Sequence, residues 1–158
     1  MRNKQKGFSL IELLIVVAII LIIAAIAIPN LLRAKMAANE ASAVGSMRTI
    51  NTSSVEYSTT YGGFPISLAS LGGPAGGTAT SSSAELVDAV LAGGTKSGYS
   101  FSYTTGATDT NGNILAYTLT AVPTSAGTTG QRQFFTDQSG VIRANATGAA
   151  SVNSTPLS

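Results

Sequence analysis

The sequence predicts an α+β fold in which one long N-terminal helix, about residues 8–60, packs on a small antiparallel sheet of three or four strands. Three observations predict it. An apolar run begins at Phe8 and gives way to small residues at helical spacing as far as Ser58. Two glycines and Pro65 then stop the helix. In the second half of the chain, large and small polar residues alternate with the period of two that half-buried strands require.

The first element is an apolar segment, Phe8–Ile28, whose only polar residues are Ser9 and Glu12. As a helix these residues would be roughly 31 Å long, which is enough to cross the hydrocarbon core of a bilayer. The segment therefore predicts a transmembrane helix with its one charge near one end.

Three interpretations of this segment compete. A secretory signal peptide is disfavoured because the apolar run is longer than a usual signal, although Ala24-Ala25-Ile26-Ala27 partly matches a cleavage site. A plain membrane anchor would be oriented by the basic residues on its two sides. The basic residues before the segment only slightly outnumber those after it, because Arg33 and Lys35 follow on its other side. In the third interpretation, the chain is cleaved just before Phe8 and the apolar segment stays on the mature protein.

Composition narrows the function classes. The chain has nine basic and seven acidic residues, but Arg2, Lys4 and Lys6 precede the apolar segment. Without these three the protein is nearly neutral, which gives no support for direct nucleic-acid binding. The sequence contains no Cys, His or Trp. The usual general bases and thiolate ligands are therefore missing, and we expect neither an enzyme nor a bound cofactor.

The junction at Gly7 resembles a known processing signal. A basic leader, Met1–Gly7, precedes Phe8-Ser9-Leu10-Ile11-Glu12-Leu13 and an unbroken apolar run. This arrangement resembles the class III signal of type IV pilins and type II secretion pseudopilins, over about Lys4 to Leu32. The resemblance implies the pilin fold. It also implies that a prepilin peptidase cleaves after Gly7, methylates the new N-terminus at Phe8 and leaves the apolar segment in place.

Glu12 is the candidate assembly residue. A carboxylate inside an apolar membrane segment is unfavourable by about 2.5–3.5 kcal/mol at the helix centre, and less near an end. Cleavage would create an amine at Phe8, four residues before Glu12 and therefore one helical turn away. That amine could neutralise Glu12 in the same subunit or in an adjacent one and set the axial register. In the alternative interpretation, Glu12 simply lies among the lipid headgroups.

Pro29 follows the apolar segment and removes one helical hydrogen bond. It predicts a hinge used during packing, as in related pilins. The alternative is that Pro29 ends a transmembrane helix and a second helix begins after it.

Beyond Pro29 the helix continues to about residue 60 and carries two stripes at helical spacing. The first is formed by Ala34, Ala37, Ala41, Val44 and Val55, and the second by Met36, Ala43, Met47, Ile50 and Tyr57. A short helix is predicted from Ser83, as N-cap, to Leu91. Four strands are predicted after it, at Tyr99–Thr104, Ile114–Ala121, Arg132–Thr136 and Val141–Ala144.

A weak candidate for a calcium site lies between the first and second of these strands, at Asp109, Asn111 and Asn113. Oxygen-bearing side chains at alternate positions with a nearby glycine begin a calcium loop. The twelfth position, however, is Thr120 rather than Glu, and Asn111-Gly112 is a strong hairpin signal. The sequence therefore favours a turn over a metal site.

These features predict a leader at residues 1–7, a transmembrane or filament-core helix at 8–29, an amphipathic helix at 30–60 and a head at 61–158. The resemblance implies a structural subunit of a type IV pilus-like filament whose partners are copies of itself, the peptidase, an inner-membrane platform protein and an assembly ATPase. It implies an inner-membrane precursor and then a surface filament or a periplasmic pseudopilus. The alternatives are a major pseudopilin of a type II secretion system and a non-polymerising, membrane-anchored binding domain.

Overall fold

The computed structural model describes residues 7–73 and 76–157, so the predicted leader lies outside the described residues except for Gly7. The chain forms two compact units, Met1–Lys35 and Met36–Ser158. Each unit is described by itself below.

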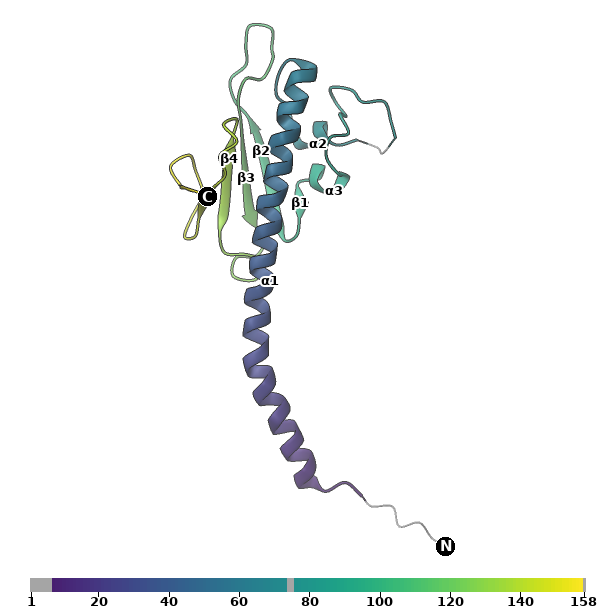
Figure 1. Cartoon of the computed structure of the whole chain (residues 1–158), viewed down its shortest axis with the longest axis vertical. Helices are drawn as coiled ribbons and strands as arrows, with labels where there is room; N and C mark the ends of the chain where they lie inside the picture. The colour runs from purple at the N-terminus through teal and green to yellow at the C-terminus, as the bar shows by residue number, and fades with distance from the viewer. Residues whose placement is uncertain (1–6, 74–75, 158) are drawn as a thin grey trace. The chain divides into compact units, whose positions relative to one another are not determined.

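The long helix is present. Helix α1 runs from Leu10 to Tyr61 and has 52 residues, as the apolar segment and the small residues after it predict (Figure 1). It ends where two glycines follow. Gly62 has φ +85°, a conformation that favours glycine, and its N–H donates to the Ser58 carbonyl at 3.0 Å.

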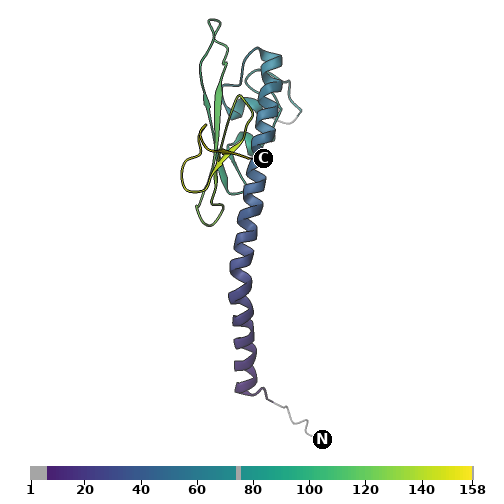
Figure 2. The ribbon, with the colours of Figure 1, turned by 60° about the vertical axis from the view of Figure 1, so that its left-hand side comes forward.

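The sheet is antiparallel throughout and has six strands in the order β1-β2-β3-β4-β5-β6. Figure 2 shows strands of this sheet running alongside the C-terminal part of α1. The strands are β1 Thr95–Lys96, β2 Tyr99–Thr105, β3 Tyr117–Pro123, β4 Gln133–Asp137, β5 Arg143–Asn145 and β6 Thr155–Pro156. The predicted α+β class is confirmed. The four predicted strands correspond to β2–β5, and two-residue strands extend the sheet at both edges.

Two details differ from the predicted strands. β3 begins at Tyr117 rather than Ile114, because the residues before it belong to the connection from β2: Leu115 N–H donates to the Ala107 carbonyl. Leu115 is consequently 54% exposed, although its position in the alternation predicts burial. The tail contributes β6, whose residues pair with Arg143 and Ala144 of β5.

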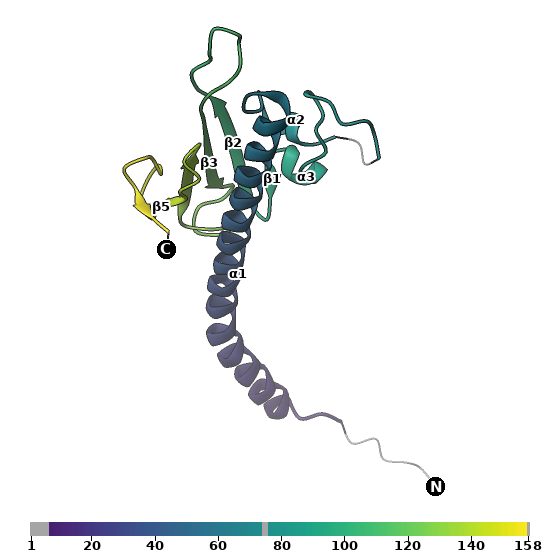
Figure 3. The same ribbon diagram turned by 45° about the horizontal axis from the view of Figure 1, so that its top comes forward.

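The core of the C-terminal unit lies between one stripe of α1 and one face of the sheet (Figure 3). The helix contributes four buried residues of the predicted stripe that begins at Met36, namely Ala43, Met47, Ile50 and Tyr57. The sheet opposes them with alternate residues of its three longest strands, namely Tyr99, Phe101, Tyr117, Leu119, Ala121 and Phe134. The period-two alternation in β2 and β3 is therefore confirmed where those strands cross the helix.

The predicted helix Ser83–Leu91 is wrong in its extent. Besides α2, Leu68–Leu71, the described part of the connection contains only α3, Ala89–Ala92. Asp88, not Ser83, is the N-cap and accepts the Leu91 N–H at 2.9 Å. The preceding residues cannot be helical because Glu85 has φ 56° and the N–H groups of Ala84 and Leu86 donate to the Ser70 and Leu71 carbonyls.

Glu40 fixes α1 to the connection between β3 and β4. Its Oε1 accepts the backbone N–H of Gln131 at 2.9 Å and of Arg132 at 3.1 Å, and its Oε2 accepts Arg132 Nε at 2.7 Å. Burial alone raises the pKa of the Glu40 carboxyl, but the two backbone bonds and the Arg132 guanidinium outweigh it and hold the pKa below 4.5. The folded unit therefore favours the ionised carboxylate.

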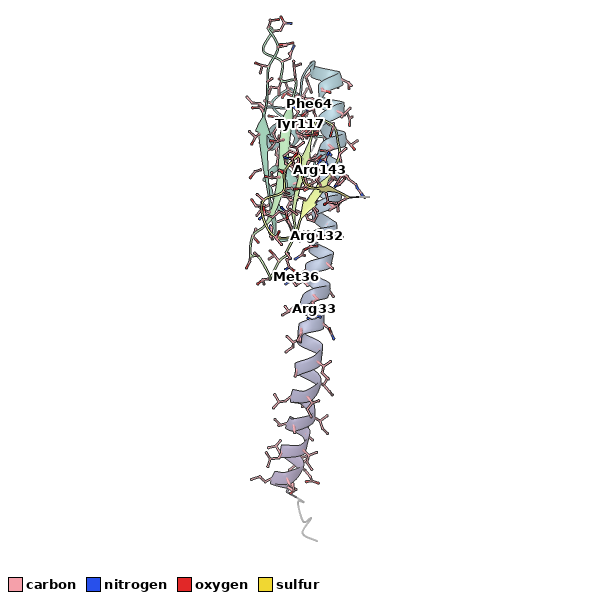
Figure 4. The ribbon with its side chains drawn as sticks, turned by 90° about the vertical axis from the view of Figure 1, so that its left-hand side faces the viewer. Arg33, Met36, Phe64, Tyr117, Arg132 and Arg143 are labelled. Atoms are coloured by element: carbon pink, nitrogen blue, oxygen red, sulfur yellow. The ribbon has the colours of Figure 1, made fainter. Side chains whose placement is uncertain are left out.

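A second polar contact lies inside the core. Asn51 of α1 accepts the Tyr117 hydroxyl at 3.0 Å and donates to Thr136 Oγ1 at 3.1 Å, so one amide joins the helix to β3 and β4. The Tyr117 ring also meets Phe64 edge-on, with ring centroids 4.9 Å apart (Figure 4). A buried amide with both functions used specifies one register of helix on sheet.

We predict that Glu40→Ala lowers the free energy of unfolding by about 1–3 kcal/mol, because two backbone N–H groups and the Arg132 guanidinium lose a charged acceptor. The wild-type contribution should be complete above pH 4.5 and be lost as the pH falls through the lower pKa of the folded state. Urea unfolding in detergent, followed by near-ultraviolet circular dichroism, measures both effects. Glu56→Ala, at an exposed position on the same helix, is the control. Equal losses in the two variants would contradict this role of Glu40.

Alkali should also destabilise the C-terminal unit. Burial raises the pKa of Tyr99 and of Tyr117 from 10 to about 12. The folded state then holds these protons where the unfolded state has released them, so stability is full below pH 10 and falls as the pH rises from 10 to 12. Tyrosinate absorbance should appear together with loss of near-ultraviolet dichroism. Ionisation of all tyrosines near pH 10 in the folded protein would show that these rings are not buried as described.

Candidate assembly segment

The first part of α1 is an apolar surface that the described chain leaves exposed. Its most apolar 18 residues are not buried, and the helix is long and apolar enough to cross a membrane. Large exposed side chains recur along its whole circumference: Leu10, Ile11, Leu13, Leu14, Ile15, Val16, Val17, Ile19, Ile20, Leu21, Ile22, Ile23, Ile26, Ile28, Leu31 and Leu32. A continuous apolar patch of this size requires lipid or protein around it.

Gly7 and Phe8, the predicted processing residues, lie immediately before the helix. Both are exposed and outside regular structure, and the Phe8 side chain is 79% exposed. A Cβ placed on Gly7 would meet no described atom within 4 Å. The peptide bond between Gly7 and Phe8 is therefore not covered by other described residues.

Glu12 lies in the first turn of α1 and bonds to the backbone. Its Oε2 accepts the Ser9 N–H at 2.9 Å, while the Leu13 N–H donates to the Ser9 carbonyl at 3.3 Å as the first helical bond. This is the glutamate half of a capping box, in which a Glu at the third helical position reaches back to the N-cap residue. This contact was not predicted, although Ser9-x-x-Glu12 before an apolar run signals a capping box.

Pro29 lies inside α1, and the helix continues through it to Tyr61. The alternative that Pro29 ends one helix before a second begins is therefore wrong. Because proline has no N–H, the carbonyl of Ala25 lacks the partner that any other residue at position 29 would supply. The helix has one weakened turn just after the apolar segment.

Asp109, Asn111 and Asn113 come together in the loop between β2 and β3. Asp109 Oδ1 accepts the N–H groups of Asn111 and Asn113, both at 2.8 Å, and Oδ2 accepts Asn113 Nδ2 at 2.9 Å. The side-chain bond from Asn113, with the backbone bonds, holds the Asp109 pKa below its usual range. Both carboxylate oxygens thus close the turn. Among residues 7–73 and 76–157, no group of three or more acidic, His or Cys residues could hold a metal.

Comparison with known proteins points to the same end of the chain. Residues 2–28 match the family model for the prokaryotic N-terminal methylation motif. The chain is 68% identical over 40 residues to the type IV wide pilus major component PilA4 of Thermus thermophilus. It is 54% identical over 52 residues to the type IV major fimbrial protein FimA of Dichelobacter nodosus.

Residues 2–28 thus carry a prokaryotic N-terminal methylation motif, and part of the chain is similar to major type IV pilus proteins. The similarity covers 25% and 31% of this chain, and it spans only about a third of the length of these relatives, 30% and 33%. No solved structure gives a significant match. The pilin likeness in sequence therefore rests on the methylation motif and the apolar segment, while the pilin-like arrangement of helix and sheet rests on the fold itself.

Proposed function

We propose that this protein is the structural subunit of a type IV pilus-like filament, cut after Gly7 and polymerised through its N-terminal helix. The observation that carries the proposal is the fully exposed apolar segment directly behind a methylation-motif junction. Lipid can cover that surface before assembly, and copies of the same helix can cover it afterwards. The named activities of the similar proteins, as major components of pili, agree with this use.

Assembly then exchanges lipid contacts for helix contacts. Since lipid tails are as apolar as the side chains of the segment, the gain comes from packing and from polar groups that find partners. We propose that the amine exposed at Phe8 after cleavage pairs with Glu12 of an adjacent subunit. A like pairing for every subunit would set axial register and remove an unpaired carboxylate from the filament core.

Pro29 has a proposed role in the same step. The missing bond to Ala25 makes this turn the easiest place for α1 to bend or loosen as the helix is packed. In this view residues 8–29 form the filament core, residues 30–60 continue into the head, and residues 61–158 complete the head. The leader, residues 1–7, is removed.

The implied partners follow from the pilin likeness. A prepilin peptidase would cut and methylate the chain, and a platform protein with a cytoplasmic ATPase would extract it from the inner membrane. The precursor would cross that membrane once, with residues 36–158 outside the cytoplasm, and the product would be a surface filament. A purely structural part agrees with the lack of His and Cys in the sequence.

Mass spectrometry of the mature N-terminus tests the processing step. We expect a chain that begins at Phe8 and carries one added methyl group on its amine. Gly7→Ala supplies the matched variant, because it changes the residue on the leader side of the junction and leaves the mature chain unaltered. An intact Met1 in purified filaments, or a start near Ala27, would refute the processing proposed here.

Substitution of Glu12 tests assembly. Glu12→Ala should insert into the membrane as well as the wild type, since it removes the only charge of the apolar segment. Filament yield in sheared fractions should nevertheless fall to a small fraction, because the Phe8 amine loses its partner. Glu56→Ala is the control on the same helix. Normal filaments from Glu12→Ala would show that this carboxylate has no part in polymerisation.

A further inference from the structure

The loop between β2 and β3 carries an asparagine that the proposed function does not use. Among the asparagines of the sequence, Asn111 alone is followed by glycine. We infer that Asn111 is a site of spontaneous deamidation, at which water converts the side-chain amide into a carboxylate. The inference goes beyond the proposed function, because the reaction needs neither cleavage of the leader nor polymerisation.

The reaction is an attack by the main chain on a neighbouring side chain. The Gly112 backbone nitrogen gives up its proton to water and forms a bond to Asn111 Cγ. The bond from Cγ to the side-chain nitrogen breaks, and that nitrogen takes up a proton and leaves as ammonia. Water then opens the cyclic succinimide at either carbonyl and yields aspartate or isoaspartate. A following glycine favours the attack, because it has no Cβ and its backbone rotates freely.

The structure leaves this peptide accessible. Asn111 and Gly112 are both exposed, and Gly112 has φ +85°, a conformation that favours glycine. A Cβ placed on Gly112 would meet no described atom within 4 Å, so the space beside this residue is open. Within residues 7–73 and 76–157 the Asn111 side chain has no hydrogen-bond partner, and its amide can therefore turn toward the Gly112 nitrogen.

Asn113 lies in the same loop but is protected. Its Nδ2 donates to Asp109 Oδ2 at 2.9 Å, and the β-branched Ile114 follows it and crowds the attacking nitrogen. Asn153 in the tail is exposed, but the residue after it has a Cβ. Accessibility, a free amide and a following glycine therefore coincide at Asn111.

The loop also restrains the reaction. The Gly112 N–H donates to the Asp109 carbonyl at 3.1 Å, and Asp109 Oδ1 accepts the Asn111 N–H at 2.8 Å. Both bonds hold the backbone in the turn, and the bond from Gly112 must break before its nitrogen can attack. Asp109 is therefore a positioning residue that slows deamidation.

The product changes the charge of the loop. Deamidation places a second carboxylate two residues from Asp109, and isoaspartate also adds a methylene to the main chain. The change stays local, because the Leu115 N–H bonds to the Ala107 carbonyl and the Phe64 N–H to the Ile114 carbonyl, both at 2.8 Å. In the filament proposed above, older subunits would carry more negative charge at this loop than newly added ones.

Peptide mapping by mass spectrometry tests the site. The full-length protein in detergent micelles is incubated at mildly alkaline pH and digested at intervals, and the fragments locate each converted asparagine. We expect conversion at Asn111 about tenfold faster than at Asn113, which is hydrogen-bonded and precedes a β-branched residue. Equal rates at the two positions, or earlier conversion at another asparagine, would overturn the inference. This readout needs no filament, so it is independent of the proposed function.

Two substitutions test the chemistry and the restraint. Asn111→Gln keeps an amide but lengthens the side chain, so the early charged product should disappear; its persistence would assign the product to another residue. Asp109→Ala should speed conversion at Asn111 about fivefold, the factor expected for the loss of one ordinary hydrogen bond. An unchanged rate would remove Asp109 from the mechanism.

A third substitution tests whether the change is local. Asn111→Asp is the charge standard: it should match the aged wild type on isoelectric focusing and keep the near-ultraviolet circular dichroism of the fresh protein. Asn113→Asp is the matched control, since it adds the same charge but removes the bond from Asn113 Nδ2 to Asp109. Loss of the dichroism in Asn111→Asp would show that the effect of this charge extends into the core.

Discussion

The C-terminal unit depends on one contact, the packing of a single stripe of α1 on one face of the sheet. Met47 and Ile50 are completely buried in it, and alternate residues of β2, β3 and β4 join them in one core cluster with Leu68, Leu71 and Leu91. Outside those three strands the sheet is short. Two buried polar contacts, at Glu40 and Asn51, restrict the helix to one position on that face, because a slide of one turn would leave charged or amide groups without partners.

Two acidic residues of this helix act in the same way. Glu12 and Glu40 each accept backbone N–H groups that no regular element satisfies, at the helix start in one case and in the β3–β4 connection in the other. Asp88 and Asp109 do likewise at a short helix and in a hairpin loop. In a chain with few charges, carboxylates are thus placed largely where backbone donors would otherwise be unpaired, which explains why none of them gathers into a metal site among the described residues.

How far the sequence predicts this structure depends on how local each signal is. Helix α1, its stop at the two glycines and the alternation of β2 follow from neighbouring residues, and they were predicted. The extent of α3 was not predicted. The backbone of Glu85 and its neighbours is held out of a helix by hydrogen bonds to carbonyl groups at and near Ser70, and local propensity does not reveal these bonds. Arg132, the partner of Glu40, lies 92 residues further along the chain, and β6 is defined only by its pairing with β5. Neither contact has a local sequence pattern. In the candidate site, Gly7, Phe8 and Glu12 were found by motif, while the Ser9 contact was not predicted although the local spacing Ser9-x-x-Glu12 signals it.

The C-terminal strand β6 is held to the sheet by few contacts, and this matters when the chain is under tension. Without cysteine, the last strand is held by two residue pairs to β5, the Leu157 N–H bond to Ile142 and the Arg143 bond to the Ser154 carbonyl. Strand β6 would peel away bond by bond if the C-terminus were pulled. In the filament proposed above, which is joined through N-terminal helices, tension would pass from helix to helix and not through the tail. A closure that releases and re-forms without redox chemistry would then be sufficient, and changes or peptide fusions at the tail would not weaken the proposed fibre.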